Sequence, residues 1–283
     1  MSCSIARLMI ISRMMYFFSA IVYVFSAALI PSLAGAADYV GISQCVACHK
    51  AQTELWTGSH HDLAMQHATD KTVLADFNNT QFTYAGITSS FYKKNNNFMV
   101  RTDGPDGKLR DYEIKYVFGV TPLQQYLVEL DNGHLQALTI AWDTRDKQDG
   151  GQRWFHLYPD EKITHKDELH WTRTNFNWNG MCAECHSTNL EKNYDSNADT
   201  FKTSWSEIDV SCEACHGPSS KHISWAKKEP GWESLNNNKG LDVSFDERKG
   251  IEWRLNTETG NAQRSSERTT EKEIQVCAQC HSR

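Results

Sequence analysis

The chain has 283 residues, of which 40% are hydrophobic and 23% are charged, a composition typical of globular proteins with one or two domains. Its formal net charge is −6, and it contains no dense block of Lys and Arg. Nucleic acid is therefore excluded as an expected partner, because phosphate binding needs a basic patch.

Residues 1–37 have the pattern of a secretory signal peptide. Arg7 and Arg13 supply a positive start, Met14–Ile30 is an uncharged apolar run, and Pro31 ends it before small residues suited to cleavage. An uncleaved membrane anchor is the alternative, because the run approaches the length that spans a bilayer. Either way, the sequence predicts an exported protein.

Four copies of the pentapeptide Cys-x-x-Cys-His follow this leader. Two thiols on one helical turn add to the two vinyl groups of a porphyrin, and the adjacent histidine is the first axial ligand of the iron, so each copy predicts one haem c. A zinc knuckle, a thiol redox pair or a disulfide framework explains one copy alone but not four. The predicted thioether residues are Cys45, Cys48, Cys182, Cys185, Cys212, Cys215, Cys277 and Cys280, and the proximal ligands are His49, His186, His216 and His281.

The first haem segment is expected at residues 38–80. After the first motif, the stretch from Lys50 to Ala68 combines good helix formers with apolar residues at helical spacing, which predicts a helix or a helix and turn. Such an element presents one of its histidines to an iron. In bacteria, haem is attached covalently outside the cytoplasmic membrane, so four haems agree with export to the periplasm.

Residues 81–159 contain no motif and favour strands. Tyr112–Phe118 alternates apolar and polar residues, and Asp131–Gly133 is a hairpin signal because Asn-Gly tolerates the positive φ angles of a tight turn. Thr102–Gly107 is a second turn between strand-like runs. We predict a small antiparallel β insertion.

Residues 160–283 carry the second, third and fourth haems. Aromatic residues precede the second motif, as expected where a large apolar porphyrin must be covered. The polar runs 236–240 and 256–272 are predicted as loops. The predicted fold class is α+β, with helices and loops organised by haem and the β insertion between them. Because the fourth motif ends near the C-terminus, either an earlier segment covers this haem or the chain is the front part of a longer protein.

The run Trp56-Thr57-Gly58-Ser59-His60-His61 after the first motif, with Cys212–Pro218 and a following His222, resembles the multihaem cytochromes related to the tetrahaem cytochrome of ammonia oxidisers. The resemblance is closer to longer bacterial members that carry tetratricopeptide repeats, which this chain lacks. It implies that His61 and His222 are distal haem ligands.

Eight of the 12 histidines lie outside the motifs, so there are enough of them for a second imidazole on every iron. His67 and His170 are further candidates for distal ligands, and each is equally consistent with an ordinary hydrogen-bonded histidine. His60 has the opposite phase to His61 and suits a hydrogen bond to a propionate. His134 adjoins the predicted hairpin turn, and His156 and His165 stay undecided.

Two functions follow from four haems. Irons with two imidazole ligands transfer electrons, and the expected partners are other redox proteins: a quinol dehydrogenase, another cytochrome or a terminal reductase. One haem with an open distal position would instead make an oxidoreductase acting on a small nitrogen or sulfur compound, with Arg145, Arg153, His156 and Tyr158 as candidate acid–base groups. The alternative role of these four is pairing with propionates within the β insertion. The sequence favours electron transfer over catalysis and leaves catalysis open. It also predicts that the haem-free protein is poorly folded.

Overall fold

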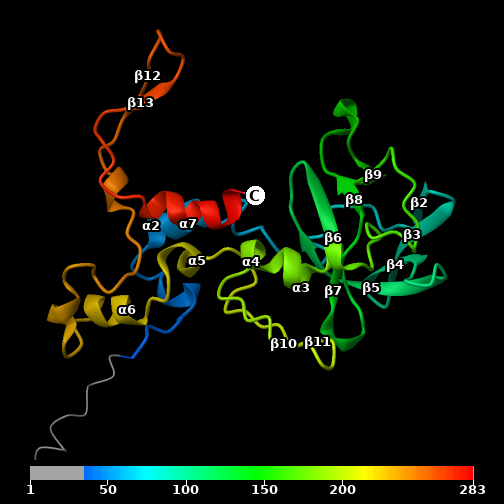
Figure 1. Ribbon diagram of the computed structural model, residues 1–283, viewed down its shortest axis with the longest axis horizontal. Helices are drawn as coiled ribbons and strands as arrows, with labels where there is room; N and C mark the ends of the chain where they lie inside the picture. Colours follow the sequence, from blue (N-terminus) through cyan, green and yellow to red (C-terminus); the bar gives the residue numbers. More distant parts are fainter. Residues whose placement is uncertain (1–34, 283) are drawn as a thin grey trace, which may run out of the picture. The chain divides into compact units, whose positions relative to one another are not determined.

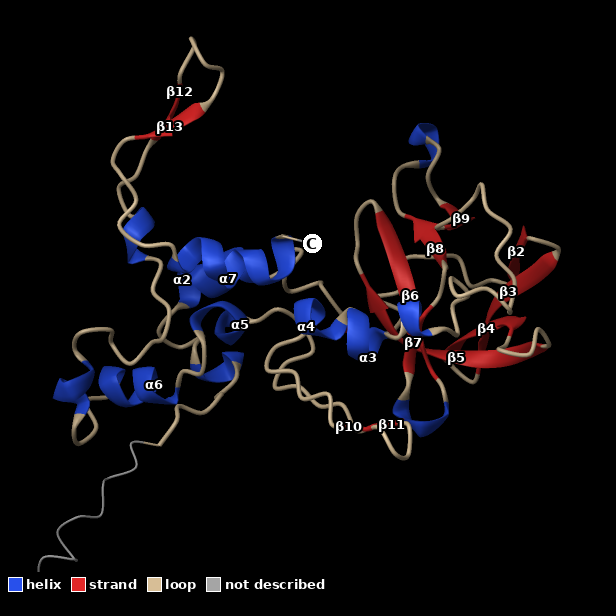
Figure 2. Cartoon of the chain, in the orientation of Figure 1, coloured by secondary structure: helices blue, strands red, loops and turns tan. Residues whose placement is uncertain are grey.

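The computed structural model describes residues 35–282 (Figure 1). The predicted leader lies outside the described residues except for its last three positions. No helix among the described residues is long and apolar enough to cross a membrane. Helices and a large antiparallel sheet both occur, so the mixed α+β architecture is confirmed (Figure 2).

Nine strands form one antiparallel sheet, which we call the β region. Its order is β2-β3-β4-β5-β6-β8-β9, with β1 paired to β5 and β7 paired to β6. The strands are β1 (Gln66–His67), β2 (Thr80–Tyr84), β3 (Ile87–Lys94), β4 (Asn97–Asp103), β5 (Leu109–Phe118), β6 (Leu123–Glu129), β7 (Leu135–Ala137), β8 (Ile140–Asp143) and β9 (Arg153–His156). The sheet thus begins within the segment expected to hold only the first haem.

Tight turns join these strands where the sequence predicted them. The turn after Asp103 connects β4 to β5, and the Asp131–Gly133 turn connects β6 to β7. Asn132 adopts a φ of 63° in the second turn, a left-handed conformation that Asn tolerates better than most residues. Both hairpins are therefore confirmed. In β5, a bulge between Ile114 and Tyr116 interrupts the alternation expected for a regular strand.

The β region has an aromatic core of its own. Phe91 is fully buried, and its ring stacks on that of Trp154 with centroids 3.6 Å apart. Phe77 makes edge contacts with the rings of Phe98 and Tyr126. Full burial of one large apolar side chain contributes about 2–3 kcal/mol to stability. This region needs no porphyrin to complete its core.

A second core joins the sheet to the second motif. Trp178, on α3 (Trp178–Met181), is fully buried and packs in one cluster with Met65 and Leu127. Ala183, the first residue of α4 (Ala183–His186), belongs to the same cluster. The Asn177 side chain caps α3 by accepting a hydrogen bond from the Gly180 amide at 2.9 Å. The second motif is thereby fixed against the β region.

The other helices bury little. They are α2 (Lys50–Trp56), α5 (Cys212–His216), α6 (Ser220–Ala226) and α7 (Lys272–His281). No residue of α2, α6 or α7 is buried, and Leu55 on α2 is 85% exposed. Short helices are stabilised mainly by packing an apolar face against other groups. For these helices, the described residues do not supply that packing.

Of the two alternatives predicted for residues 50–68, the helix and turn is confirmed, because the helix ends at Trp56 and Gly58 adopts a φ of 77° where the chain turns. One local prediction needs correction. The predicted loop 256–272 includes β13 (Ala262–Arg264), which pairs with β12 (Trp253–Leu255) in a separate hairpin. A second two-stranded sheet, formed by β10 (Tyr194–Asp195) and β11 (Thr200–Phe201), follows the second motif.

Candidate functional site

Each Cys-x-x-Cys-His motif lies on a helical turn. The third motif is α5 itself, the second lies at and just before α4, and the fourth ends α7. In the first motif, the His49 amide donates to the Cys45 carbonyl at 3.0 Å, the bond of an α-helical turn. Residues three and four apart share one face of a helix. Both thiols of a motif can therefore reach one porphyrin edge, and the histidine on the same face can reach the iron.

The motifs meet one another through their cysteines. A hydrogen bond between the Cys45 and Cys212 thiols lowers the pKa of Cys212 to about 7 and raises the pKa of Cys45. Burial raises the pKa of Cys215, and the nearby Cys277 raises it further. The helix α4, which carries the second motif, contacts α7. The tertiary structure thus brings together motifs that are far apart in the sequence.

Two histidines outside the motifs lie beside motif histidines. The ring of His222 lies next to that of His49 with centroids 5.9 Å apart, and the ring of His61 lies next to that of His281 at 6.1 Å. Two imidazoles on opposite sides of one metal ion have centroids about 6 Å apart, because each metal–nitrogen bond is about 2 Å long. Both spacings therefore fit an iron between the two rings.

Hydrogen bonds orient three of these imidazoles. The Nδ1 atoms of His186, His216 and His222 lie 2.8, 3.1 and 2.8 Å from the carbonyl oxygens of Ala64, Val243 and Lys239, respectively. A carbonyl only accepts, so Nδ1 carries the proton and donates it. The other nitrogen, Nε2, then keeps its lone pair for a metal, as in most metal-bound histidines.

Several apolar side chains around the motifs are exposed to solvent. Val46 lies inside the first motif and is 40% exposed, Met181 precedes the second motif and is 51% exposed, and Ile274 on α7 is 45% exposed. A porphyrin attached at the neighbouring cysteines would cover such side chains. Within residues 35–282, no three His, Cys, Asp or Glu side chains converge as a site for a metal ion.

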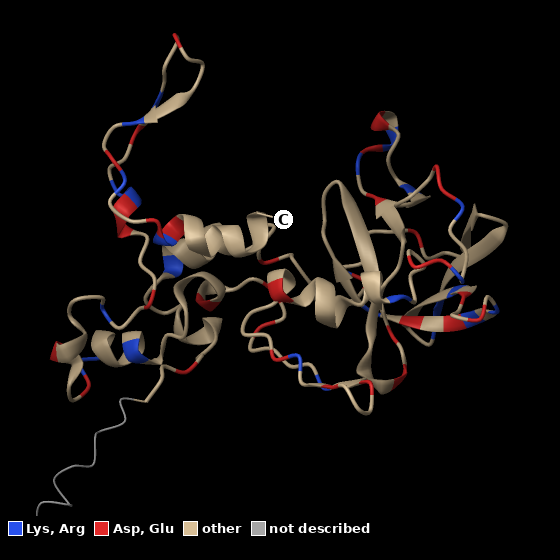
Figure 3. Ribbon diagram, in the orientation of Figure 1, with Lys and Arg blue, Asp and Glu red and all other residues tan. Residues whose placement is uncertain are grey.

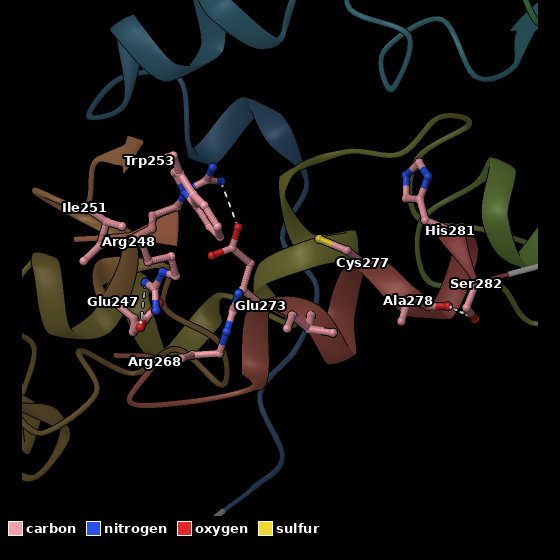
Figure 4. A pocket seen from close by; sticks show the side chains of 12 residues that line it. Glu247, Arg248, Ile251, Trp253, Arg268, Glu273, Cys277, Ala278, His281 and Ser282 are labelled. Atoms are coloured by element: carbon pink, nitrogen blue, oxygen red, sulfur yellow. Dashed lines mark hydrogen bonds and ion pairs between the residues drawn. The ribbon is translucent and has the colours of Figure 1, made fainter. Parts of the chain in front are cut away.

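A cavity of about 470 Å³ lies beside α7 (Figure 4). Cys277 and His281 line it from the helix, and Trp253 lines it from the β12–β13 hairpin. Figure 4 also shows an ion pair between Arg248 and Glu273, 2.9 Å long, along the same wall. The cavity therefore adjoins the fourth motif and combines apolar with charged walls, as haem and its propionates require.

The other two candidate distal ligands lie in the β region. His67, on β1, is exposed, and its ring contacts that of Tyr116 with centroids 5.2 Å apart. His170 is buried, with Nε2 3.2 Å from Asp103 Oδ2 and Nδ1 2.8 Å from Thr172 Oγ1. The structure does not pair either ring with a motif histidine.

The candidate acid–base groups also belong to the β region. Arg145 forms an ion pair with Asp143, and the Arg153 guanidinium donates to the Gly150 carbonyl at 2.8 Å. His156 is buried on β9, where it accepts a hydrogen bond from the Tyr158 amide. These contacts engage the side chains of Arg145, Arg153 and His156 within the sheet and its loops, whereas Tyr158 contributes its backbone amide.

Sequence reasoning missed three carboxylates near the first and third motifs. Glu213 is buried within the third motif, and Glu207 binds the backbone just before the first motif. Burial, together with the charges of Asp62 and Glu207, raises the pKa of Asp209 to about 7. For Glu213 the sequence did hold a signal, because an acidic residue inside a haem motif must have its charge either compensated by buried partners or screened by solvent.

A family model described as "Cytochrome c554 and c-prime" matches residues 44–94 and 141–217 of the chain. The matched residues include the first three motifs and His61 but neither the fourth motif nor His222. No curated protein matches the chain.

Two solved structures resemble the chain only distantly. The outer cell wall cytochrome OcwA is 20% identical with a TM-score of 0.42, and the match covers 74% of this chain and 36% of OcwA. The undecahaem cytochrome from the S-layer of Carboxydothermus ferrireducens is 19% identical with a TM-score of 0.38, and the match covers 73% of this chain and 25% of that protein. The chain thus spans roughly a third or less of each.

Proposed function

We propose that this protein, a multihaem c-type cytochrome by its motifs and by the family model that it matches, transfers electrons through four covalently bound haems. The observation that carries the proposal is the pairing of imidazoles, His222 next to His49 and His61 next to His281. An iron held by two imidazoles has no position for a substrate. Electron transfer is therefore the activity that this arrangement supports best.

The chain's own residues hold and shield the cofactors. The two cysteine sulfurs of each motif would form the thioether bonds, and the motif histidine would bind through Nε2. The carbonyl oxygens behind His186, His216 and His222 keep these rings oriented and make Nε2 a stronger donor. The bound haem supplies one-electron exchange between Fe(III) and Fe(II).

Contacts between the motifs support an order of transfer. The first motif meets the third at Cys45 and Cys212, and Cys277 of the fourth motif lies near enough to Cys215 of the third to raise its pKa. The second motif adjoins the fourth where α4 contacts α7. We expect electrons to pass between the first, third and fourth haems in that order, with the second haem joining at the fourth.

The predicted leader supports export to a bacterial periplasm. We propose other redox proteins as partners: a quinol dehydrogenase or another cytochrome as donor, and a terminal reductase as acceptor. Contact with a membrane is proposed only through such a partner or through an uncleaved leader. Figure 3 shows Lys and Arg interspersed with Asp and Glu, and we propose no nucleic-acid partner.

A second candidate function is favoured by the other two motifs. The rings that contact His186 and His216 are those of Phe118, with centroids 5.5 Å apart, and Phe245, at 4.8 Å. Within residues 35–282 these contacts supply no second imidazole to either motif histidine, and an iron held by a single imidazole would keep an open position. An oxidoreductase acting on a small nitrogen or sulfur compound needs such a position.

Electron paramagnetic resonance of the oxidised, haem-loaded protein, together with a haem count on the same sample, tests both functions. Electron transfer predicts four haems per chain and low-spin signals from every iron. A high-spin signal from one iron would favour the oxidoreductase. A count below four would overturn the proposed cofactor content whatever the spin state.

A further inference from the structure

Glu213, the second residue of the third motif, is a buried carboxylate that is only 2% exposed. Its Oε1 accepts hydrogen bonds from the amides of Val40 at 3.1 Å and Ser219 at 2.8 Å. Its Oε2 accepts from the amides of Val40 at 3.0 Å and Gly41 at 2.8 Å. Both oxygens act only as acceptors, which is the arrangement of a charged carboxylate. The ion pairs formed within residues 35–282 do not include Glu213.

These bonds hold the segment that leads into the first motif. Beside Glu213, the Glu207 carboxylate accepts from the Ile42 amide at 2.9 Å, and Asp38 exchanges two hydrogen bonds with Ser220. Gly41 has a φ of 78°, and a Cβ placed there would lie 2.9 Å from Glu207 Oε1. Glycine thus permits the close approach of this backbone to the two carboxylates.

The attachment explains how the first and third motifs come together. The held segment ends three residues before Cys45. The Cys45 thiol forms a hydrogen bond with the thiol of Cys212, which precedes Glu213 in the chain. Tyr39, in the same segment, has a raised pKa because it is buried and because the charges of Glu213 and Asp242 oppose its ionisation. The Glu213 charge therefore acts where the first and third haems would be attached.

Resting on the proposed function, we propose that Glu213 is a positioning residue that holds the first haem beside the third and lowers the reduction potential of both. Oxidised haem carries one more positive charge than reduced haem, so a nearby carboxylate stabilises the oxidised form. The interaction is strong because the surroundings of a buried charge screen it less than water does. Glu184 offers the contrast, because it lies inside the second motif but is exposed to solvent.

The test compares the wild-type haem-loaded protein with Glu213→Gln and Glu184→Gln by spectroelectrochemical titration and by haem content. Glutamine keeps the size of the side chain and removes the charge. We expect the potentials of two haem components to rise in Glu213→Gln and none to move in Glu184→Gln. Glu213→Asp retains the charge, and we expect its potentials to stay closer to those of the wild type.

The outcomes separate this inference from the proposed function. Unchanged potentials in a fully haem-loaded Glu213→Gln would overturn the inference and leave electron transfer standing. If this variant loses haem, Glu207→Gln gives the electrostatic test, since Glu207 has a single backbone partner in the segment. We expect a smaller rise in the same two components, and no rise would overturn the inference. A wild-type protein with fewer than four haems would overturn the proposed function itself.

Discussion

Hydrogen bonds to ring nitrogens divide the histidines into two classes. In His186 and His222, Nδ1 donates to a carbonyl, which leaves Nε2 available to a metal. In His170 both ring nitrogens are engaged, by Asp103 and by Thr172. Binding a metal through Nε2 of His170 would break its hydrogen bond to Asp103 and leave that buried carboxylate without this partner. We therefore assign His170 to the stability of the β region.

His156 makes the stability of the β region dependent on pH. Burial lowers its pKa to about 4 from the ordinary 6.5, and its ring stacks on Tyr84 with centroids 3.6 Å apart. Between pH 6.5 and pH 4, His156 binds a proton in the unfolded chain but stays neutral in the folded chain. The free energy of unfolding therefore falls as the pH falls from 6.5 to 4. We expect this one group to cost on the order of 2 kcal/mol across that window.

The variant His156→Gln tests this dependence. Glutamine retains an acceptor for the Tyr158 amide but does not titrate, so the variant should lose less stability than the wild type between pH 7 and pH 4. Urea unfolding followed by tryptophan fluorescence at several pH values measures the difference. The same pH dependence in both proteins would show that His156 is not the responsible group.

At the scale of elements, the turn between β6 and β7 packs against β11. Gly133 has a φ of 76°, and a Cβ there would lie 2.2 Å from the Phe201 carbonyl oxygen. Gly150 has a nearly identical φ of 79° with open space around it. We expect both glycine-to-alanine variants to bear the cost of a left-handed conformation, and Gly133→Ala to lose about 1–3 kcal/mol more through the clash. Urea unfolding of the two variants measures this difference, and equal losses would contradict the close packing.

The elements also differ in their need for haem. Both hydrophobic cores involve the sheet, whereas α2, α6 and α7 bury no residue. The sequence led us to expect a poorly folded haem-free protein, and the structure restricts this expectation to the segments that contain α2, α6 and α7. In haem-free protein we expect proteases to cleave residues 38–60 and 211–282 readily and to spare 80–156. Mass spectrometry of the fragments would identify the cleavage sites, and equally rapid cleavage throughout would contradict a separately stable sheet.

At the scale of the whole molecule, the paired imidazoles join segments that are remote in the chain. His61 follows the first motif but lies next to the histidine of the fourth, and His222 follows the third motif but lies next to that of the first. Each of these two candidate ligands therefore belongs to a segment that carries a different motif from the one whose histidine it contacts. Loss of one such histidine should weaken the contact between two haem segments as well as the ligation of one iron.

The variants His61→Ala and His222→Ala test the two pairs. We expect each to convert one of the four haems from low spin to high spin, because an alanine leaves one coordination position empty. His60→Ala is the matched control, since its neighbour His61 remains in place, and it should leave the low-spin signals unchanged. Electron paramagnetic resonance measures the conversion. An unchanged spectrum for His61→Ala or His222→Ala would exclude that histidine from the ligand set.

The sequence alone predicts the covalent chemistry of this protein. A Cys-x-x-Cys-His motif occupies a single helical turn, so five contiguous residues specify two thiols and a ligand without reference to the rest of the fold. The Asp131–Gly133 hairpin was equally local. The β12–β13 hairpin was missed because each of its strands has only three residues, which leaves little alternation to detect.

Only the tertiary structure decided which histidine lies next to which motif and what binds Glu213. His222 and His49, like Glu213 and Val40, are more than 170 residues apart, and no local pattern encodes their meeting. Such contacts arise from the packing of whole segments, whose order in space is free to differ from their order in the chain. The identity of the cofactor is thus a property of adjacent residues, whereas the order of electron transfer is a property of the fold.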